Sequence, residues 1–317
     1  MHMSKKSSST GEVRIHKRWD RDDTELSILA LPTTIWYILF LFLPMFGIII
    51  AFKSWQISGS FISNMINSPW CGWDNFAVLF RTGAIWGYLR NTILYNIVFI
   101  ILNIVLPVIC TLMVSMLHGK RLAKVYQTCM FMPYFLSWVV ISALVWAFLC
   151  YDNGLINNMF FADNPQQWYM KPEIWPFLLT FLNTWKVLGY NMVVYLATVT
   201  GIDRSLYEAA IIDGATIWQQ VRSITLPMLK SVIIMMFIMN VGRIFYSDFG
   251  LFFQVTRDSN SITGITTTLD VYVYRMLKLG TTGMSSAAAF IQSVAGCITI
   301  LVANGIVRKI DPESAMI

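Results

Sequence analysis

Six long apolar runs divide the chain and constrain its fold more than any other feature of the sequence. They lie at about residues 28–52, 86–117, 126–150, 174–199, 228–253 and 284–307. Each has the roughly 20 residues that an α-helix needs to cross the hydrocarbon core of a bilayer. Hydrophobic residues make up 56% of the chain and charged residues only 13%, unlike the composition of ordinary globular domains. The sequence therefore predicts an all-α, polytopic membrane protein with six transmembrane helices.

The predicted domain organisation has three parts. Residues 1–27 form a polar, Ser-rich tail, residues 28–310 the transmembrane domain with a polar segment at 203–227, and residues 311–317 a second tail. Pro44, Pro107 and Pro133 lie in or near the apolar runs and predict kinks. Membrane helices tolerate such kinks where neighbouring groups satisfy the freed carbonyls, so we expect these helices to pack in a bundle.

The distribution of Lys and Arg predicts the orientation in the membrane. With six spans, the side that holds both termini and residues 203–227 carries 14 of these residues, and the other side carries seven. Because basic residues gather on the cytoplasmic side, we expect both termini and residues 203–227 in the cytoplasm. The net charge of +6 does not indicate nucleic acid, since the basic residues lie in short clusters between apolar runs.

The connections on the opposite, outer side contain short apolar runs. Two of them, Phe76 to Phe80 and Leu155 to Phe161, predict short helices. These helices would lie on the membrane surface or against a partner, or would pack on the protein itself. The sequence leaves both alternatives open.

A polar, helix-prone segment, Tyr207 to Pro227, interrupts the apolar pattern. Apolar residues recur every three or four positions on both sides of Gly214, which predicts a helix, a turn and a second short helix. Gly214 is expected to take a positive φ at the turn. Pro227 fits the first turn of the next helix, where its missing N–H costs nothing.

Small side chains and carboxylates lie together on the first of these helices. Ala209 and Ala210 carry little side chain, so another backbone can approach closely. Glu208 and Asp213 place carboxylates beside that contact. This combination is typical of a surface that docks a partner, although an interfacial amphipathic helix could show it by chance.

The segment resembles the EAA loop of binding-protein-dependent ABC importer permeases. The resemblance rests on Glu208-Ala209-Ala210, then Gly214, then Ile224-Thr225-Leu226-Pro227, matched without a gap. In that family the loop is cytoplasmic and docks into a groove on the ATPase subunit. The resemblance implies that the ATPase-coupling residues are Glu208, Ala209, Ala210, Asp213, Gly214, Ile224, Leu226 and Pro227.

Further residues resemble the maltose-type, carbohydrate-uptake branch of the family. They are Trp185-Lys186, Gly189-Tyr190-Asn191 and Gly201-Ile202-Asp203, and the likeness covers nearly all of the chain from about residue 28 onward. It implies a type I importer permease in a bacterial cytoplasmic membrane. The implied partners are a second homologous permease, an ATPase dimer, an extracytoplasmic sugar-binding protein and an oligosaccharide.

Motifs for chemistry on the chain itself do not occur. The only Gly-Lys pair, Gly119-Lys120, has Val114 and Arg121 where a phosphate-binding loop needs Gly and Ser or Thr. No spacing typical of a metal site or of a catalytic His, Ser or Cys is present. We therefore expect a transport subunit without cofactor, metal or catalytic site, with ATP and Mg bound by the partner ATPase.

Polar residues inside two of the apolar runs form the candidate substrate pathway. Lys186 and Arg243 lie at bilayer depth if both runs are continuous helices, so each should face a partner charge or a watery cavity. The aromatic, amide and charged residues near them suit a sugar's apolar face and hydroxyls; they are Asn183, Trp185, Tyr190, Asn191, Tyr246 and Asp248. Two basic residues against one acidic residue favour an acidic, uronate-containing oligosaccharide over a neutral one.

Structural roles for the same charges remain open. Arg243 could pair with Asp248 or with a carboxylate of the second permease, and Lys186 could bond to helix carbonyls.

Three functional alternatives also remain. The chain could be an ABC permease for another solute class, a stand-alone secondary transporter or channel with Lys186, Arg243 and Asp248 as its relay, or an intramembrane enzyme. The resemblance to the EAA loop argues against the last two, which need no ATPase.

Overall fold

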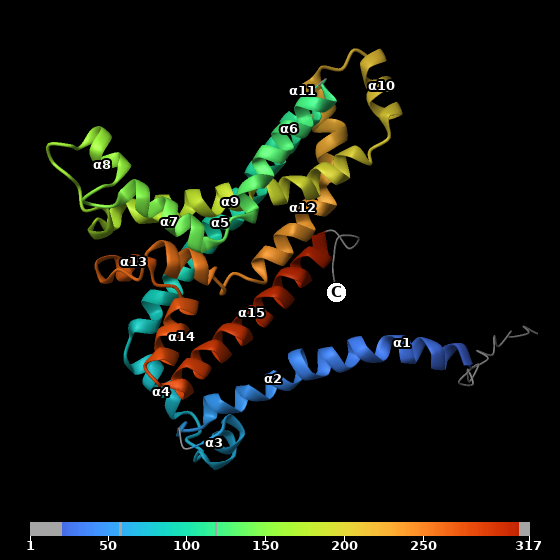
Figure 1. Ribbon diagram of the computed structural model, residues 1–317. Helices are drawn as coiled ribbons and strands as arrows, with labels where there is room; N and C mark the ends of the chain where they lie inside the picture. The colour runs from blue at the N-terminus through green and yellow to red at the C-terminus, as the bar shows by residue number, and fades with distance from the viewer. Residues whose placement is uncertain (1–20, 57–58, 118, 311–317) are drawn as a thin grey trace, which may run out of the picture. The chain divides into compact units, whose positions relative to one another are not determined.

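A computed structural model describes residues 21–56, 59–117 and 119–310, and the regular elements within these ranges are helical (Figure 1). The chain divides into two units, Met1–Ile49 and Ile50–Ile317. Within the first unit, α1 (Arg21–Tyr37) continues into a π-helical turn, η1 (Ile38–Phe42), and then into α2 (Leu43–Met45); η2 (Phe46–Phe52) follows. Of the predicted N-terminal tail, residues 1–20 lie outside the described residues and residues 21–27 belong to α1; the predicted C-terminal tail, 311–317, also lies outside them.

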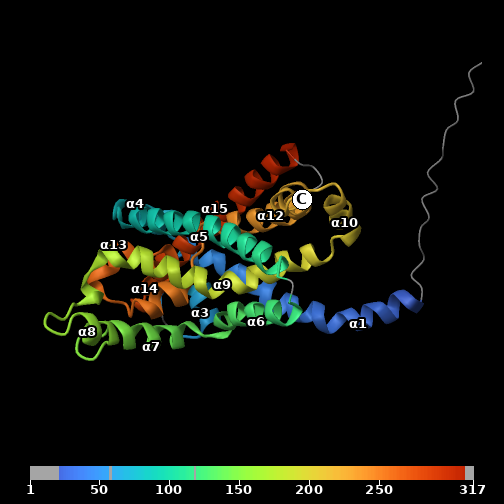
Figure 2. The ribbon, with the colours of Figure 1, turned by 90° about the horizontal axis from the view of Figure 1, so that it is seen from above.

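Four longer helices form the frame of the second unit: α5 (Ala84–Ser115), α9 (Trp175–Thr200), α12 (Leu226–Val241) and α15 (Thr282–Ile310). Of these, α5 and α9 lie side by side (Figure 2). Polar groups join them: Asn103 Nδ2 donates to Asn183 Oδ1 at 3.0 Å, and Asn191 Nδ2 donates to the Asn103 carbonyl at 3.1 Å. Buried hydrogen bonds of this kind fix two membrane helices against each other because no water competes for the groups.

A sharp bend interrupts the third apolar run. The helix α6 (Lys120–Phe131) continues into a 3₁₀ turn, η3 (Met132–Phe135), and α7 (Trp138–Leu149) then leaves at 95° to the preceding helix (Figure 1). Pro133 lies in the 3₁₀ turn, where a kink was expected. Ser137 begins α7 by accepting a hydrogen bond from the backbone N–H of Val140.

The predicted span at 228–253 is not one continuous helix. α12 ends at Val241, a turn follows, and a second, π-helical segment, η7 (Gly250–Val255), begins at Gly250. The turn is fixed by Asp270, whose Oδ2 accepts from the backbone N–H and the hydroxyl of Ser247 at 2.6 and 2.8 Å. Arg243 therefore lies in this turn, two residues after the end of α12, and its depth in the membrane remains a prediction.

By length and composition, four helices in the described ranges can cross a membrane, or five if α6 and α7 count as one bent span. α9 is 26 residues long but is not among these membrane-crossing helices. Its polar residues include Asn183, Lys186 and Asn191. The number of six spans remains a prediction.

The connections contain shorter helices: α3 (Phe61–Asn67), α4 (Asp74–Arg81), α8 (Leu155–Phe160), η4 (Trp168–Met170), η5 (Pro172–Ile174), η8 (Asn260–Ile262), α13 (Thr263–Thr266) and α14 (Leu269–Lys278). Of these, α4 and α8 correspond to the two short helices expected from the sequence. Phe76 of α4 packs with Ala51 and Ala287, and Leu79 packs with Leu269, so α4 packs on its own unit.

The largest hydrophobic core of the second unit lies where α7, α9 and η7 meet. Its fully buried members include Ile141, Trp175, Leu179, Leu251 and Phe252. Burial of each such side chain contributes about 1.5–3 kcal/mol. This core holds the broken segments, α7 and η7, against the continuous helix α9.

Candidate functional site

The predicted helix, turn and second helix of residues 203–227 are present. They are α10 (Arg204–Ile212) and α11 (Ile217–Gln220), followed by the π-helical turn η6 (Val221–Thr225). Asp203 begins α10 by accepting a hydrogen bond at 3.0 Å from the backbone N–H of Ser205. Hydrogen bonds from Ser205 stabilise the ionised carboxyl and hold the pKa of Asp203 below its usual value.

Gly214 ends α10 in the left-handed conformation, with φ of +75°, as expected. Its N–H donates to the Ile211 carbonyl at 3.0 Å, and the N–H of Ala215 donates to the Ala210 carbonyl at 2.8 Å. These two bonds form a Schellman motif, which satisfies carbonyls at the helix end. A residue with a side chain would be strained at Gly214.

The second half of the segment is tied back to the transmembrane helices. Thr216 begins α11 in a capping box with Gln219. The hydroxyls of Tyr207 and Thr225 are hydrogen-bonded at 2.9 Å, which links α10 to η6. Pro227 lies in the first turn of α12.

The remaining residues of this group separate into exposed and anchoring positions. Glu208, Ala209 and Asp213 are exposed and Ala210 is half-buried. Ile224 and Leu226 are also half-buried, and Leu226 packs against the core that contains Tyr195 and Leu229. The exposed residues can contact a partner, whereas Leu226 fixes the segment to α12.

Exposed apolar side chains accompany Glu208 on α10 and α11. Ile212 is 86% exposed and Trp218 is 69% exposed, and Leu206, Ile211 and Ile217 are also exposed. We call these five residues together with Glu208 the coupling surface. Large apolar side chains gathered in one exposed segment are typical of an interaction site.

Lys186 lies at the bend between α6 and α7. Its ammonium group donates to the carbonyl of Tyr134 at 2.9 Å and also to the carbonyl of Leu136. The same nitrogen lies 5.7 Å from the ring centroid of Tyr134 and 5.3 Å from that of Trp138. Lys186 is thus bonded to carbonyls that the bend frees, which is the structural alternative considered from the sequence.

A glycine allows this approach of α9 to α6. A Cβ placed on Gly189 would lie 2.1 Å from the carbonyl oxygen of Met130 and 2.5 Å from the Cα of Phe131. Both are backbone atoms, so no side-chain movement could relieve the overlap. Gly189 therefore sets the distance at which Lys186 meets the bend.

Asp248 is hydrogen-bonded to the indole of the same tryptophan. Its Oδ2 accepts a hydrogen bond from Trp138 Nε1 at 2.6 Å, and its Oδ1 accepts from the backbone N–H of Gly250 at 2.9 Å. A Cβ on Gly250 would lie 2.3 Å from Cδ1 of Trp138, so the backbone at the start of η7 lies close against this tryptophan. Lys186, Trp138 and Asp248 form the centre of what we call the intramembrane cluster.

Two tyrosines extend the intramembrane cluster. Tyr134 and Tyr190 stack with ring centroids 4.6 Å apart and 11° between the planes. Tyr190 is 44% exposed and Tyr134 is 38% exposed, so the pair presents an accessible aromatic surface beside the Lys186 ammonium. Such a surface can stack on the apolar face of a sugar ring.

The other predicted pathway residues lie elsewhere. Asn183 and Asn191 are buried and bonded to α5, as described above, and Trp185 packs against the main hydrophobic core. Tyr246 donates from its hydroxyl to Ser293 Oγ at 3.2 Å. Arg243 is exposed and its side chain makes no hydrogen bond or ion pair with any described residue, so it does not pair with Asp248 here.

Sequence reasoning missed two members of the intramembrane cluster, Tyr134 and Trp138. Both flank the break that follows Pro133. Aromatic residues beside a proline-dependent break in an apolar run could have indicated them, because such a break frees carbonyls that attract a cation.

Comparisons with known proteins agree with this architecture. Residues 103–313 match the model of a family described as the binding-protein-dependent transport system inner membrane component. The chain is 30% identical over 291 residues to the polygalacturonan/rhamnogalacturonan transport system permease protein YteP of Bacillus subtilis, covering 91% of this chain and 89% of that protein. It is 31% identical over 212 residues to the lactose transport system permease protein LacF of Rhizobium radiobacter, covering 65% and 69% of the two chains.

A solved structure is also similar. It is a crystal structure of a bacterial ABC transporter involved in the import of the acidic polysaccharide alginate, with a TM-score of 0.81 and 29% identity. The match covers 92% of this chain and 97% of that chain. From the family match and the extent of these similarities, the chain belongs to the inner membrane components of binding-protein-dependent transport systems, the permease subunits of ABC importers.

Proposed function

We propose that the chain imports acidic, uronate-containing oligosaccharides, as one of two homologous permease subunits driven by a partner ATPase dimer. Two relatives act on acidic glycans by their names: one is a polygalacturonan/rhamnogalacturonan permease and the other belongs to an alginate importer. In a second matching structure that transporter is in complex with a periplasmic protein bound to an alginate pentasaccharide, which supports a sugar-binding protein as a further partner. Both termini and the coupling surface lie in the cytoplasm in this proposal.

Positive charge without a carboxylate partner carries the proposal for an acidic cargo, and Lys186 supplies such charge although two of its three N–H donors are bonded to the Tyr134 and Leu136 carbonyls. An ammonium group lies against Tyr134 and Trp138, beside the stacked and exposed ring of Tyr190. Uronate sugars need a cation for the carboxylate and aromatic faces for the ring. The exposed Arg243 adds a second cation whose donors are not used by any residue that the structure describes.

The coupling surface supports the proposal for an ATPase partner. Exposed Ile211, Ile212 and Trp218 would cost free energy in water unless another protein covers them. Glu208 in the same surface can pair with a basic group of that partner. ATP and Mg would be bound there and not on this chain, and hydrolysis would act on the permease through α10 and α11.

The test is glycan-stimulated ATP hydrolysis by the reconstituted complex with its binding protein. A uronate oligomer should stimulate hydrolysis, and Arg243→Gln should reduce that stimulation by about 3- to 10-fold more than the stimulation by a neutral oligomer of equal length, since one charge-assisted contact is lost. Arg81→Gln, which removes an exposed cation from α4, is the matched control. Stimulation by neutral sugars alone, or equal losses for both sugars, would contradict the acidic cargo.

Purification tests the class of transporter separately. The chain should co-purify with an ATPase and with a second permease. A chain that transports its solute alone in proteoliposomes would instead be a secondary transporter or channel.

A further inference from the structure

One face of α7 runs alongside the segment from Asp248 to Arg257. Trp138, Ser142 and Trp146 are four residues apart and so lie along one ridge of the helix. Trp138 contacts Asp248, the Ser142 hydroxyl donates to the Gln254 carbonyl at 2.6 Å, and Trp146 meets Arg257. The two ends of this ridge are about 12 Å apart at 1.5 Å per residue.

Arg257 stacks on the tryptophan at the far end of the ridge. Its guanidinium carbon lies 4.1 Å from the ring centroid of Trp146, and the indole is 38% exposed. Tyr169 also packs against Trp146, with ring centroids 5.2 Å apart and 59° between the planes. The arrangement repeats the pairing of Lys186 with Trp138 two helical turns away.

The backbone at Arg257 is strained. Arg257 and Asp258 have φ of 52° and 51°, two consecutive residues with side chains in the left-handed region. Each such residue costs about 1–2 kcal/mol, so surrounding contacts must impose the conformation. Strain of this kind often marks ligand-binding segments.

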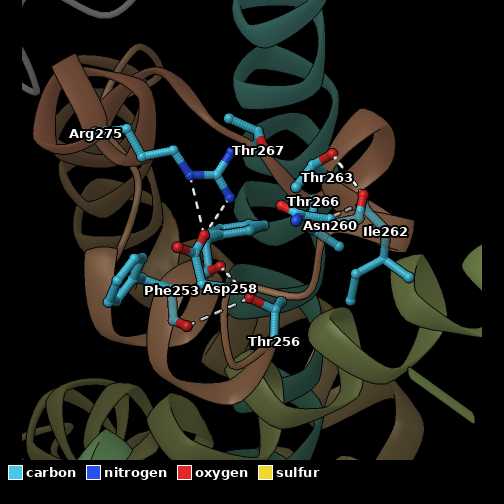
Figure 3. A network of polar contacts seen from close by, with 10 residues as sticks. Phe253, Thr256, Asp258, Asn260, Ile262, Thr263, Thr266, Thr267 and Arg275 are labelled. Carbon is cyan, nitrogen blue, oxygen red and sulfur yellow. Dashed lines mark hydrogen bonds and ion pairs between the residues drawn. The ribbon is translucent and has the colours of Figure 1, made fainter. Parts of the chain in front are cut away.

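Several contacts hold the segment around Asp258, and Figure 3 shows the one with Arg275. Arg275 points at Asp258 and forms an ion pair with it, and its Nη1 donates to Thr267 Oγ1 at 3.1 Å. On the preceding turn Thr256 Oγ1 donates to the Phe252 carbonyl at 2.7 Å. Ser259 Oγ donates to the Tyr169 carbonyl at 3.1 Å. Asp258 is thereby occupied by Arg275, which leaves Arg257 without a carboxylate neighbour in its own turn.

Most cations that lie over aromatic rings have their hydrogen-bond donors occupied. Lys53 and Lys186 donate to backbone carbonyls, and Lys171 donates to Gln166 Oε1. In contrast, the side chains of Arg257 and Lys278 donate no hydrogen bond to any described residue. Of these two, Arg257 has the planar guanidinium that binds a carboxylate through two parallel bonds.

We propose that Arg257 and Trp146 form an outer subsite that binds one uronate unit before the sugar reaches the intramembrane cluster. Trp146 holds the guanidinium in place by the stacking contact, and the N–H groups at the edge of the Arg257 guanidinium bind the carboxylate. The subsite rests on the proposed function, since it needs an acidic oligosaccharide and an outward-facing end of α7. A chain long enough to bridge about 12 Å would contact both subsites at once.

The test compares three variants in the reconstituted complex. Arg257→Gln should raise the concentration of uronate-loaded binding protein needed for half-maximal ATP hydrolysis by about 5- to 20-fold, the loss of one bidentate contact. Arg257→Lys keeps the charge and should need a concentration between those of the wild type and Arg257→Gln, because an ammonium group binds a carboxylate without the two parallel bonds of a guanidinium. Lys171→Gln removes an equal charge at a residue whose ammonium group is already bonded within the protein. It should change the concentration for half-maximal hydrolysis by less than about 2-fold.

Comparison of uronate and neutral oligomers distinguishes the possible roles of Arg257. The effect of Arg257→Gln should be confined to uronate oligomers and should be larger for oligomers that reach both subsites than for a single unit. An equal effect with a neutral oligomer would show that Arg257 contacts the binding protein, and equal values for Arg257→Gln and Lys171→Gln would show that only the overall charge matters; either result overturns the subsite. Failure of uronates to stimulate the wild-type complex would refute the proposed function itself, which is a different result.

Discussion

Asp248 accepts a hydrogen bond from the indole N–H of Trp138, with 2.6 Å between Oδ2 and Nε1. The Lys186 ammonium lies over the ring of the same indole, so one side chain contacts both a cation and a carboxylate. The tryptophan thereby holds both charges in place without a direct ion pair between them.

Trp138→Phe should therefore keep the ring face for Lys186 but release Asp248. We expect a loss of roughly 0.5–1.5 kcal/mol in stability, toward the lower end because Asp248 is exposed. Thermal unfolding of the purified complex measures it, alone and in a double-mutant cycle with Asp248→Asn. Trp86→Phe, at a tryptophan that is 58% exposed, is the control. Full additivity of the two changes would show that the bond contributes nothing.

Gly214→Val should uncouple the permease from its ATPase. Valine at a φ of +75° is strained by about 1–2 kcal/mol or more, so the Schellman motif should open and move Glu208. We expect lower transport and weaker ATPase association, measured by uptake and by co-purification, with normal membrane insertion. Gly201→Ala is the control, because φ there is −83° and the nearest atom to the added Cβ is 3.4 Å away. Normal uptake by Gly214→Val at normal expression would exclude a role for the turn.

Glu208→Lys should also weaken the association, through charge and not through backbone strain. The side chain is exposed, so folding of this chain should be unaffected while its pairing with a basic group of the ATPase is reversed. ATPase retention during purification at low and high salt measures the effect, which should shrink at high salt. The control is Glu173→Lys, at an exposed glutamate in a connection that we propose to lie outside the cell, and it should retain the ATPase at the wild-type level.

Gly189→Ala should push α9 away from α6. The added methyl would overlap the Met130 carbonyl, so we expect a cost of about 1–3 kcal/mol and loss of the hydrogen bonds from Lys186 to the bend. Thermal unfolding and glycan-stimulated hydrolysis should both fall. Gly305→Ala in α15 adds the same methyl group where no atom lies within 4 Å and should be neutral. Equal stability of the two variants would mean that α9 can shift without cost.

Cysteine labelling tests the orientation. In a background without the five native cysteines, residues introduced at Ser60 and Asn164, both exposed, should react with an impermeant thiol reagent in intact cells. Cysteines at Leu122, 50% exposed, and at Ser7, outside the described residues, should not react. Labelling of Leu122 from outside would reverse the topology.

Local sequence signals predicted the coupling segment well. The periodic apolar residues, Gly214 and Pro227 specified the helix, the turn and the next helix, because each signal acts within a few residues of the chain. The exposure of Ile212 and Trp218 was not predicted, since periodicity indicates an apolar side of a helix and not what covers it.

The kink at Pro133 was expected from the sequence, but the angle of the bend there and the break after α12 could not be predicted. Residues 242–249 fall within the run that was expected to span to residue 253, and the contact that fixes the turn there is distant in the chain. Lys186 bonds to Tyr134 across 52 residues, and Asp270 fixes Ser247 across 23. Asn183 and Asn191 were assigned to the substrate pathway for a similar reason: their partner Asn103 lies 80 or more residues away.

The bend between α6 and α7 and the lysine of α9 compensate for each other. In a bilayer the freed carbonyls of Tyr134 and Leu136 would be costly without a donor, and the ammonium would be costly without acceptors. Loss of the bend alone, or of the lysine alone, would therefore destabilise the protein. Among relatives, a straight helix across positions 131–138 should be inherited together with an apolar residue at position 186, as a covarying pair.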